Sequence, residues 1–141
     1  MIDHVERMRV NWVDTDASGL IHYTAALRYF EVAEHALMRK LFGGRDFGAR
    51  TFLLPRVHVE ADYHAPLRYP DEFECRAWVA AVGRSSVTYG YEIQRRDGTR
   101  CITGRIVAVA CDLEGRKIPL PEPFREVLTE AAAPNPEGPA R

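Results

Sequence analysis

The hydrophobic positions of the chain predict one long helix in its first third, from about residue 24 to residue 41. Apolar side chains recur there at alternating steps of four and three residues, and charged side chains recur on the opposite face. This spacing is typical of an amphipathic helix about 27 Å long. Glycines at positions 43 and 44 predict where the helix ends. The apolar positions are Ala26, Phe30, Ala33, Leu37 and Leu41, and the charged positions are Arg28, Glu31, His35 and Arg39.

Two segments on either side of this helix have the composition of β-strands. Residues 5–13 contain β-branched and aromatic residues and end at a polar cluster that is typical of a turn. Residues 56–65 alternate more weakly, and Pro66 interrupts the pattern. We therefore expect one strand before the long helix and a second strand after it.

The region from residue 72 to residue 111 alternates between apolar and polar side chains with a period of two. A turn at Gly83 and the hairpin signal Asp97-Gly98 divide it into three strands. Because short turns join antiparallel neighbours, these strands are expected to form a meander. One or two further helical turns are predicted over residues 123–131.

One long helix between a first strand and a run of antiparallel strands predicts an α+β fold. We expect a long central helix wrapped by a curved antiparallel sheet of about five strands. Such a layer leaves a strand edge and one sheet face uncovered, which predicts a homodimer or homotetramer. The length of 141 residues fits a single domain, expected over residues 1–132, and the proline-rich residues 133–141 are expected to form a disordered tail.

Composition narrows the class of partner. The net charge is -1, from 19 basic and 20 acidic residues without a long run of either sign, so no nucleic-acid surface is predicted. Nearly all basic residues are arginines, which indicates either a phosphate-bearing ligand or biased codon usage. The N-terminus lacks the apolar core of a signal peptide, and no segment approaches the roughly 18 apolar residues of a membrane span. We expect a cytoplasmic protein that does not enter the membrane.

The cysteines do not indicate disulfides or a metal centre. Cys75, Cys101 and Cys111 are odd in number, lie within strand-like segments and lack metal-ligand spacing, which the five histidines also lack. We expect buried, reduced thiols, and neither a metal nor a cofactor.

Candidate chemistry gathers in the polar cluster directly before the long helix. Asp14, Asp16, Ser18 and Gly19 precede a helix N-terminus, whose free N–H groups and positive dipole end can bind an anion or a polarised carbonyl. The same acids are also common as turn and capping residues, and this alternative stays open. A calcium loop is excluded because Ala25 occupies the position that requires a glutamate, and because a strand precedes the cluster.

Three segments resemble the 4-hydroxybenzoyl-CoA thioesterase family, which includes the YbgC-like acyl-CoA thioesterases. They are residues 14–23 (DTDASGLIHY), residues 27–31 (LRYFE) and residues 63–66 (YHAP), and the similarity covers most of residues 5–121. The resemblance implies a hotdog fold and the hydrolysis of an acyl-CoA or acyl-carrier thioester.

The resemblance also implies roles for individual residues. The second acid of the cluster, Asp16, corresponds to the catalytic carboxylate, and the backbone N–H of Tyr23 corresponds to the group that polarises the thioester carbonyl. Many YbgC-like proteins have a histidine at the position of Tyr23, whereas this chain has His22 one place earlier. His22 is therefore an auxiliary candidate. A single carboxylate suffices as nucleophile or general base because a thiolate leaves readily.

Further candidates lie outside the cluster. Glu31 is a second possible carboxylate, since some hotdog thioesterases take theirs from the central helix, although a solvated or paired glutamate is the alternative. Ser18 and Gly19 are candidates for contacting the substrate within the loop. Arg84 and Ser85, in a turn between two strands, are candidates for binding the CoA phosphates, with a solvated turn arginine as the alternative.

Two other functions remain open on the sequence. Hotdog domains also serve as non-catalytic acyl-CoA-binding modules, and a hotdog dehydratase would place a histidine such as His22 near the helix start. The sequence does not identify the acyl group or distinguish CoA from an acyl carrier protein.

Overall fold

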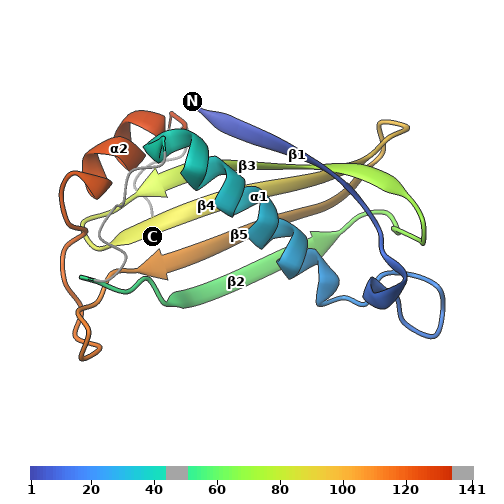
Figure 1. The fold of residues 1–141 in the computed structure, drawn as a ribbon, viewed down its shortest axis with the longest axis horizontal. Helices are drawn as coiled ribbons and strands as arrows, with labels where there is room; N and C mark the ends of the chain where they lie inside the picture. Colours follow the sequence, from blue (N-terminus) through green and yellow to red (C-terminus); the bar gives the residue numbers. More distant parts are fainter. Residues whose placement is uncertain (44–50, 135–141) are drawn as a thin grey trace.

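The computed structural model describes residues 1–43 and 51–134 and consists of a five-stranded antiparallel sheet with a long helix across one face (Figure 1). The sheet order is β1-β3-β4-β5-β2, so β1 and β2 are its edges. The elements are β1 (Asp3–Arg9), the 3-10 helix η1 (Trp12–Asp14), α1 (Ala25–Phe42), β2 (Arg56–Tyr63), β3 (Glu72–Val82), β4 (Ser86–Arg95), β5 (Arg100–Val109) and α2 (Phe124–Ala131). The predicted α+β arrangement is confirmed.

Helix α1 forms where its hydrophobic pattern predicts, and its apolar face is buried against the sheet. Four of the five predicted apolar positions are fully buried, and Leu41 is partly buried against the same core. The helix ends at Gly43, whose left-handed φ of 56° and N–H donation to the carbonyl of Arg39 (2.9 Å) form the cap. Gly44 belongs to residues 44–50, which lie outside the described part of the chain.

A glycine in β5 sets how closely α1 approaches the sheet. The ring of Phe30 stacks on the ring of Tyr91 with centroids 4.5 Å apart. A Cβ atom at Gly104 would lie 2.3 Å from the Phe30 ring, well inside van der Waals contact. The absent side chain therefore allows Phe30 to reach the sheet surface, and any larger residue would push the helix away.

The alternating pattern of the central strands is also confirmed. In β4, Val87, Tyr89, Tyr91 and Ile93 are all buried, and the alternate positions Phe73, Cys75, Ala77 and Val79 of β3 are buried beside them. The Asp97-Gly98 hairpin forms as predicted, with Gly98 at a φ of 92°. Because the buried positions of β3 and β4 share one face, they form the floor on which α1 packs.

The first strand ends earlier than the sequence predicts. β1 stops at Arg9 rather than at residue 13, and the chain turns into η1, leaving Trp12 and Val13 71% and 83% exposed. The physical reason is Asp14, whose carboxylate accepts a hydrogen bond from the N–H of Asn11 (3.2 Å) and draws the chain into a turn. An extended strand would leave this carboxylate unable to enter the core.

The chain ends and the sheet edges differ in how well they are covered. Ala133 still donates its N–H to the carbonyl of Val79 (2.9 Å), whereas residues 135–141, most of the expected tail, lie outside the described residues. Along the edge strand β2, Val57, Val59 and Tyr63 are 59%, 45% and 50% exposed. No helix in the described ranges is both long and apolar enough to cross a membrane.

Candidate active site

The loop between η1 and α1 folds back on itself and meets the segment that follows β2. The N–H of Asp16 donates to the carbonyl of Leu20 (2.9 Å), and the N–H of Ile21 donates to the carbonyl of Leu67 (3.0 Å). Gly19 has a φ of 84°, a left-handed conformation that favours glycine at this turn. The loop is thus held between the start of α1 and residues 63–67. The latter include residues 63–66, one of the three segments on which the family resemblance rests.

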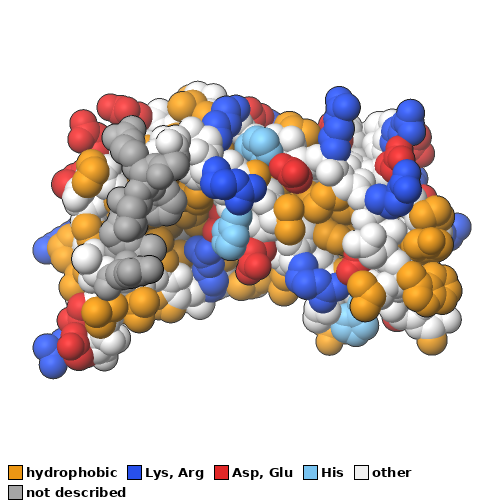
Figure 2. All heavy atoms as spheres, in the orientation of Figure 1, with side chains coloured by type: hydrophobic (Ala, Val, Ile, Leu, Met, Phe, Trp, Pro, Cys, Tyr) orange, Lys and Arg blue, Asp and Glu red, His pale blue; other side chains and the backbone are white. Residues whose placement is uncertain are grey.

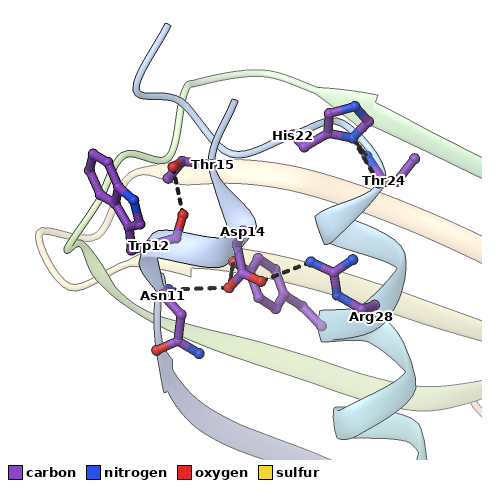
Figure 3. A network of polar contacts seen from close by, with 8 residues as sticks. Asn11, Trp12, Asp14, Thr15, His22, Thr24 and Arg28 are labelled. Atoms are coloured by element: carbon purple, nitrogen blue, oxygen red, sulfur yellow. Dashed lines mark hydrogen bonds and ion pairs between the residues drawn. The ribbon is translucent and has the colours of Figure 1, made fainter. Parts of the chain in front are cut away.

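Asp14 is the structural anchor of this loop, held by the polar contacts drawn in Figure 3, and it is only 5% exposed. One carboxylate oxygen accepts from Arg28 (2.8 Å), and the other accepts from the hydroxyl of Tyr29 (2.8 Å) and from Asn11. Burial alone raises the pKa of Asp14, but the hydrogen bonds from Tyr29 and Arg28 outweigh it, so the pKa lies below the ordinary value. The carboxylate is therefore charged and fully engaged.

Asp16 lies in the opposite environment, exposed to solvent at the tip of the loop. Its Oδ1 accepts hydrogen bonds from the N–H of Ser18 (2.8 Å) and from the Ser18 hydroxyl. No hydrogen bond to its Oδ2 is found within the described part of the chain. The Ser18 hydroxyl and then the Ser18 N–H lower the pKa of Asp16. Asp16 is consequently an ionised carboxylate with one oxygen held and the other available.

His22 takes part in starting the helix. Its Nδ1 accepts from the N–H of Thr24 (3.2 Å) and lies 2.7 Å from the Thr24 hydroxyl (Figure 3). Because Nδ1 is an acceptor, the neutral ring carries its proton on Nε2. The His22 N–H donates to the carbonyl of Asp14 (2.7 Å), and its ring stacks on Tyr23 with centroids 4.5 Å apart. His22 therefore links the anchor to the first turn of α1.

Tyr23 precedes the helix with its side chain 70% exposed. Its carbonyl accepts a hydrogen bond from the hydroxyl of Tyr63, whereas no acceptor contacts its N–H among residues 1–43 and 51–134. Hydrophobic side chains gather on the surface at the end of the molecule where η1 lies, and the exposed Trp12 and Val13 belong to that helix (Figure 2). The loop thus combines a free N–H with an apolar surrounding.

A cavity of about 300 Å³ opens beside Tyr23. Its walls come from the loop before α1, the end of β2 and the following segment, and β5, and include Leu20, Tyr63, Leu67 and Ile102. The volume is at the lower end of the range for small-molecule sites, about 300 to 1,000 Å³. An apolar group of modest size fits such a cavity.

The structure brings Asp16, Ser18, Gly19, His22 and Tyr23 together in one loop. Glu31 lies apart from them on the exposed face of α1, and the neighbouring Arg28 binds Asp14.

Arg84 and Ser85 lie at the other end of the sheet. The loop of Asp16 lies close to the start of β3, since Leu20 in that loop pairs with Arg68, four residues before the strand begins. Arg84 lies two residues beyond the last residue of β3, and the strand between spans about 33 Å at 3.3 Å per residue. Arg84 is exposed, and Ser85 is buried with its carbonyl accepting from Ala110 (2.8 Å). Within one chain these residues do not adjoin Asp16.

Other nucleophiles are less suited to chemistry than Asp16. All three cysteines are free and buried, and burial raises the pKa of the Cys75 thiol to about 12. The hydroxyl of Ser18 donates to Asp16 rather than to a histidine. Sequence reasoning missed Tyr63 and the partners of Asp14 as individual site residues, although Arg28, Tyr29 and Tyr63 lie in the segments on which the family resemblance rests.

Comparisons with known proteins identify the family of the chain. A family model described as the thioesterase superfamily matches residues 18–102. The 1,4-dihydroxy-2-naphthoyl-CoA hydrolase of Synechococcus elongatus is 26% identical over 136 residues, covering 91% of this chain and 96% of its own. The acyl-CoA thioester hydrolase YbgC of Escherichia coli is 22% identical over 110 residues, covering 74% and 79%.

A solved structure shares the whole fold. The DHNA-CoA thioesterase from Staphylococcus aureus superimposes with a TM-score of 0.83 at 23% identity, over 92% of this chain and 91% of that one. The likeness confirms the expected hotdog fold.

Proposed function

The chain belongs to the thioesterase superfamily, and from this premise we propose that it hydrolyses an acyl-CoA thioester to the free acid and CoA with Asp16 as the catalytic carboxylate. The observation that carries the proposal is the environment of Asp16. An ionised carboxylate with one free oxygen lies in the loop that ends at the free N–H of Tyr23.

In the proposed reaction the thioester carbonyl oxygen points at the N–H of Tyr23 and the start of α1. These groups stabilise the negative charge that develops on the oxygen, an effect typically worth about 10²-fold or more per donor. Asp16 either attacks the carbonyl carbon, giving a mixed anhydride that water then hydrolyses, or removes a proton from the attacking water. In both cases the C–S bond breaks and CoA leaves as the thiolate.

The remaining residues of the loop have supporting roles in this proposal. The acyl group occupies the cavity beside Tyr23, whose walls are mostly apolar. Ser18 holds Asp16, and Gly19 provides the turn that lets the loop return to the helix. His22, whose Nε2 is not used by the helix start, is available to exchange protons with bulk water.

We propose in addition that a homodimer, or a tetramer built from it, completes the site. Strand β2 is an uncovered edge with exposed apolar side chains, so a second copy can extend the sheet antiparallel across it. A two-fold axis at this edge brings the β3–β4 turn of the second copy towards the loop of Asp16. Arg84 of that copy then becomes a candidate for the CoA phosphates. Sedimentation equilibrium that showed only monomer at micromolar concentration would contradict this.

A panel of short-chain, long-chain and aryl acyl-CoA thioesters, assayed with a thiol reagent, tests the function. We expect release of CoA from at least one of them, with chain-length dependence set by the cavity. A protein that binds these thioesters without cleaving any of them is instead an acyl-CoA-binding module. Pantetheine thioesters of the preferred acyl group, assayed in parallel, separate contacts to the acyl group from contacts to the nucleotide end of CoA.

A further inference from the structure

The hydroxyl of Tyr63 makes a hydrogen bond that connects the end of β2 to Tyr23, two residues before α1 begins. Tyr63 is the last residue of β2, and its hydroxyl donates to the backbone carbonyl of Tyr23, 40 positions earlier in the chain. Burial, with a smaller contribution from Tyr23, raises the pKa of Tyr63, so the hydroxyl keeps the proton that it donates. Both residues also line the cavity of about 300 Å³.

The carbonyl of Tyr23 lies outside the hydrogen-bond ladder of α1. Thr24 is the N-cap, so the ladder begins with the carbonyl of Thr24 and not with that of Tyr23. The N–H of Leu27 donates to the carbonyl of Thr24 (3.1 Å), so the first turn is tightened. The carbonyl of Tyr23 therefore has no partner within the helix, and the hydroxyl of Tyr63 satisfies it.

The two peptide groups on either side of Tyr23 are thereby fixed. The carbonyl of His22 accepts from the N–H of Ala25 (2.8 Å), and the N–H of Thr24 donates to the His22 ring. The carbonyl of Tyr23 is held by Tyr63. Within the described part of the chain, this leaves the N–H of Tyr23 as the one polar group of these two peptides without a partner. Only the bond from Tyr63 comes from outside residues 22–25.

We infer that Tyr63 is a positioning residue: its hydroxyl holds the peptide group that follows Tyr23, while the N–H of Ala25 holds the peptide group that carries the Tyr23 N–H, and together the two bonds fix the direction of that N–H. The inference rests on the proposed role of that N–H in thioester hydrolysis. Tyr63 does not touch the reacting atoms in this scheme. It acts by keeping the donor aligned before the substrate arrives, which is the condition under which such a donor lowers the barrier.

The variant Tyr63→Phe tests the inference because it keeps the ring that lines the cavity and removes only the hydroxyl. We expect kcat to fall about tenfold, the change that corresponds to one lost neutral hydrogen bond, while KM stays within about twofold. Calorimetric binding of a non-hydrolysable acyl-CoA thioether should be unchanged. Such a split between kcat and binding would not arise from general loosening of the fold.

Tyr69→Phe is the matched control. Tyr69 is similarly exposed (48%), its ring contacts Trp12, and its hydroxyl makes no hydrogen bond to any residue that the structure describes. We expect wild-type kcat and KM for this variant. An unchanged kcat for Tyr63→Phe, or a rise in KM and a weaker thioether affinity in step with the loss of kcat, would overturn the positioning role. A wild-type protein that cleaves no thioester would overturn the proposed function itself, and this inference with it.

Discussion

Asp14 and Asp16 lie two positions apart in one loop, and the structure places them in opposite environments. Asp14 is buried and accepts hydrogen bonds from Arg28, Tyr29 and Asn11, whereas Asp16 is exposed and held only through Oδ1 by Ser18. Both carboxylates have a lowered pKa, but the opposing effect of burial is the largest single influence only for Asp14. A similar charge state therefore serves two different purposes.

The difference teaches how a small fold separates stability from chemistry. The buried carboxylate of Asp14 fixes the loop to α1, and the backbone carbonyl of Asp14 accepts from the N–H of His22. Asp14 therefore positions the backbone up to Tyr23. The exposed carboxylate contributes little to this framework and keeps one oxygen free. Reactive groups commonly depend on a rigid support that does not itself react. If the two aspartates are divided in this way, substitutions at the two positions should change different measurements.

The largest expected effect is on turnover by Asp16→Asn. An amide keeps the shape of the side chain and still accepts from Ser18, but it cannot act as nucleophile or base. We expect kcat to fall by at least roughly 10²-fold, while the free energy of unfolding in urea changes by less than about 0.5 kcal/mol. Thiol-reagent kinetics and urea melts of the same preparation measure both. Near-normal kcat would remove Asp16 from catalysis and make Glu31 the leading carboxylate.

Asp14→Asn should show the reverse pattern. An amide oxygen can accept from one partner, but its NH₂ group then faces the donors of Arg28 or Tyr29, leaving a buried donor unsatisfied. We expect the free energy of unfolding to fall by about 2 kcal/mol, with a smaller loss of kcat than in Asp16→Asn. Arg28→Ala is the control, since its side chain is 58% exposed and its loss should cost about 1 kcal/mol or less. Equal stability of Asp14→Asn and wild type would show that Asp14 is not an anchor.

Acid should remove the stabilising effect of Asp14. Because the folded-state pKa of Asp14 is lowered, its contribution is fully present above the unfolded pKa of about 3.9 and is lost as pH falls through the folded pKa. The difference in unfolding free energy between wild type and Asp14→Asn should be constant above about pH 5 and shrink towards zero in stronger acid. Urea melts at a series of pH values measure it. A difference that stayed constant down to the lowest pH would mean that the charge of Asp14 contributes nothing.

The helix and the central strands could be predicted from sequence because their signals are local and repeated. Phe30 recurs with other apolar residues at helical spacing, and Tyr89 and Tyr91 alternate along one strand face, so each residue supports the assignment of its neighbours. The end of β1 could not be predicted. It depends on a single carboxylate, Asp14, which meets Arg28 from an element 14 positions later, and no periodicity reports such a contact.

The candidate site could be predicted only in part from the sequence. The proposed roles of Asp16 and Tyr23 come from the family resemblance and not from spacing. Spacing alone also allowed both aspartates to be turn or capping residues. Burial distinguishes the two aspartates, and burial is a property of the folded chain. The position of Arg84 depends on strand order, because the turn that carries it follows β3 at the end opposite to the loop of Asp16.

The smallest and sharpest effect is expected from Ser18→Ala. The Ser18 hydroxyl is the largest cause of the lowered pKa of Asp16, and the variant keeps the N–H that donates to the same oxygen. The pKa of Asp16 should therefore rise towards its ordinary value. At pH 7 the carboxylate remains ionised in both proteins, so kcat/KM should change by less than about threefold.

The difference should emerge in acid, where a carboxylate with a raised pKa takes up its proton earlier as the pH falls. The acid limb of the kcat/KM profile, measured from about pH 3 to pH 7, should shift to higher pH in Ser18→Ala. Thr15→Val is the control, because the Thr15 hydroxyl donates to the carbonyl of Trp12 (2.7 Å) and not to Asp16. Its acid limb should match that of the wild type. A Ser18→Ala profile that superimposed on the wild-type profile would mean that the group titrating in catalysis is not the carboxylate that Ser18 holds.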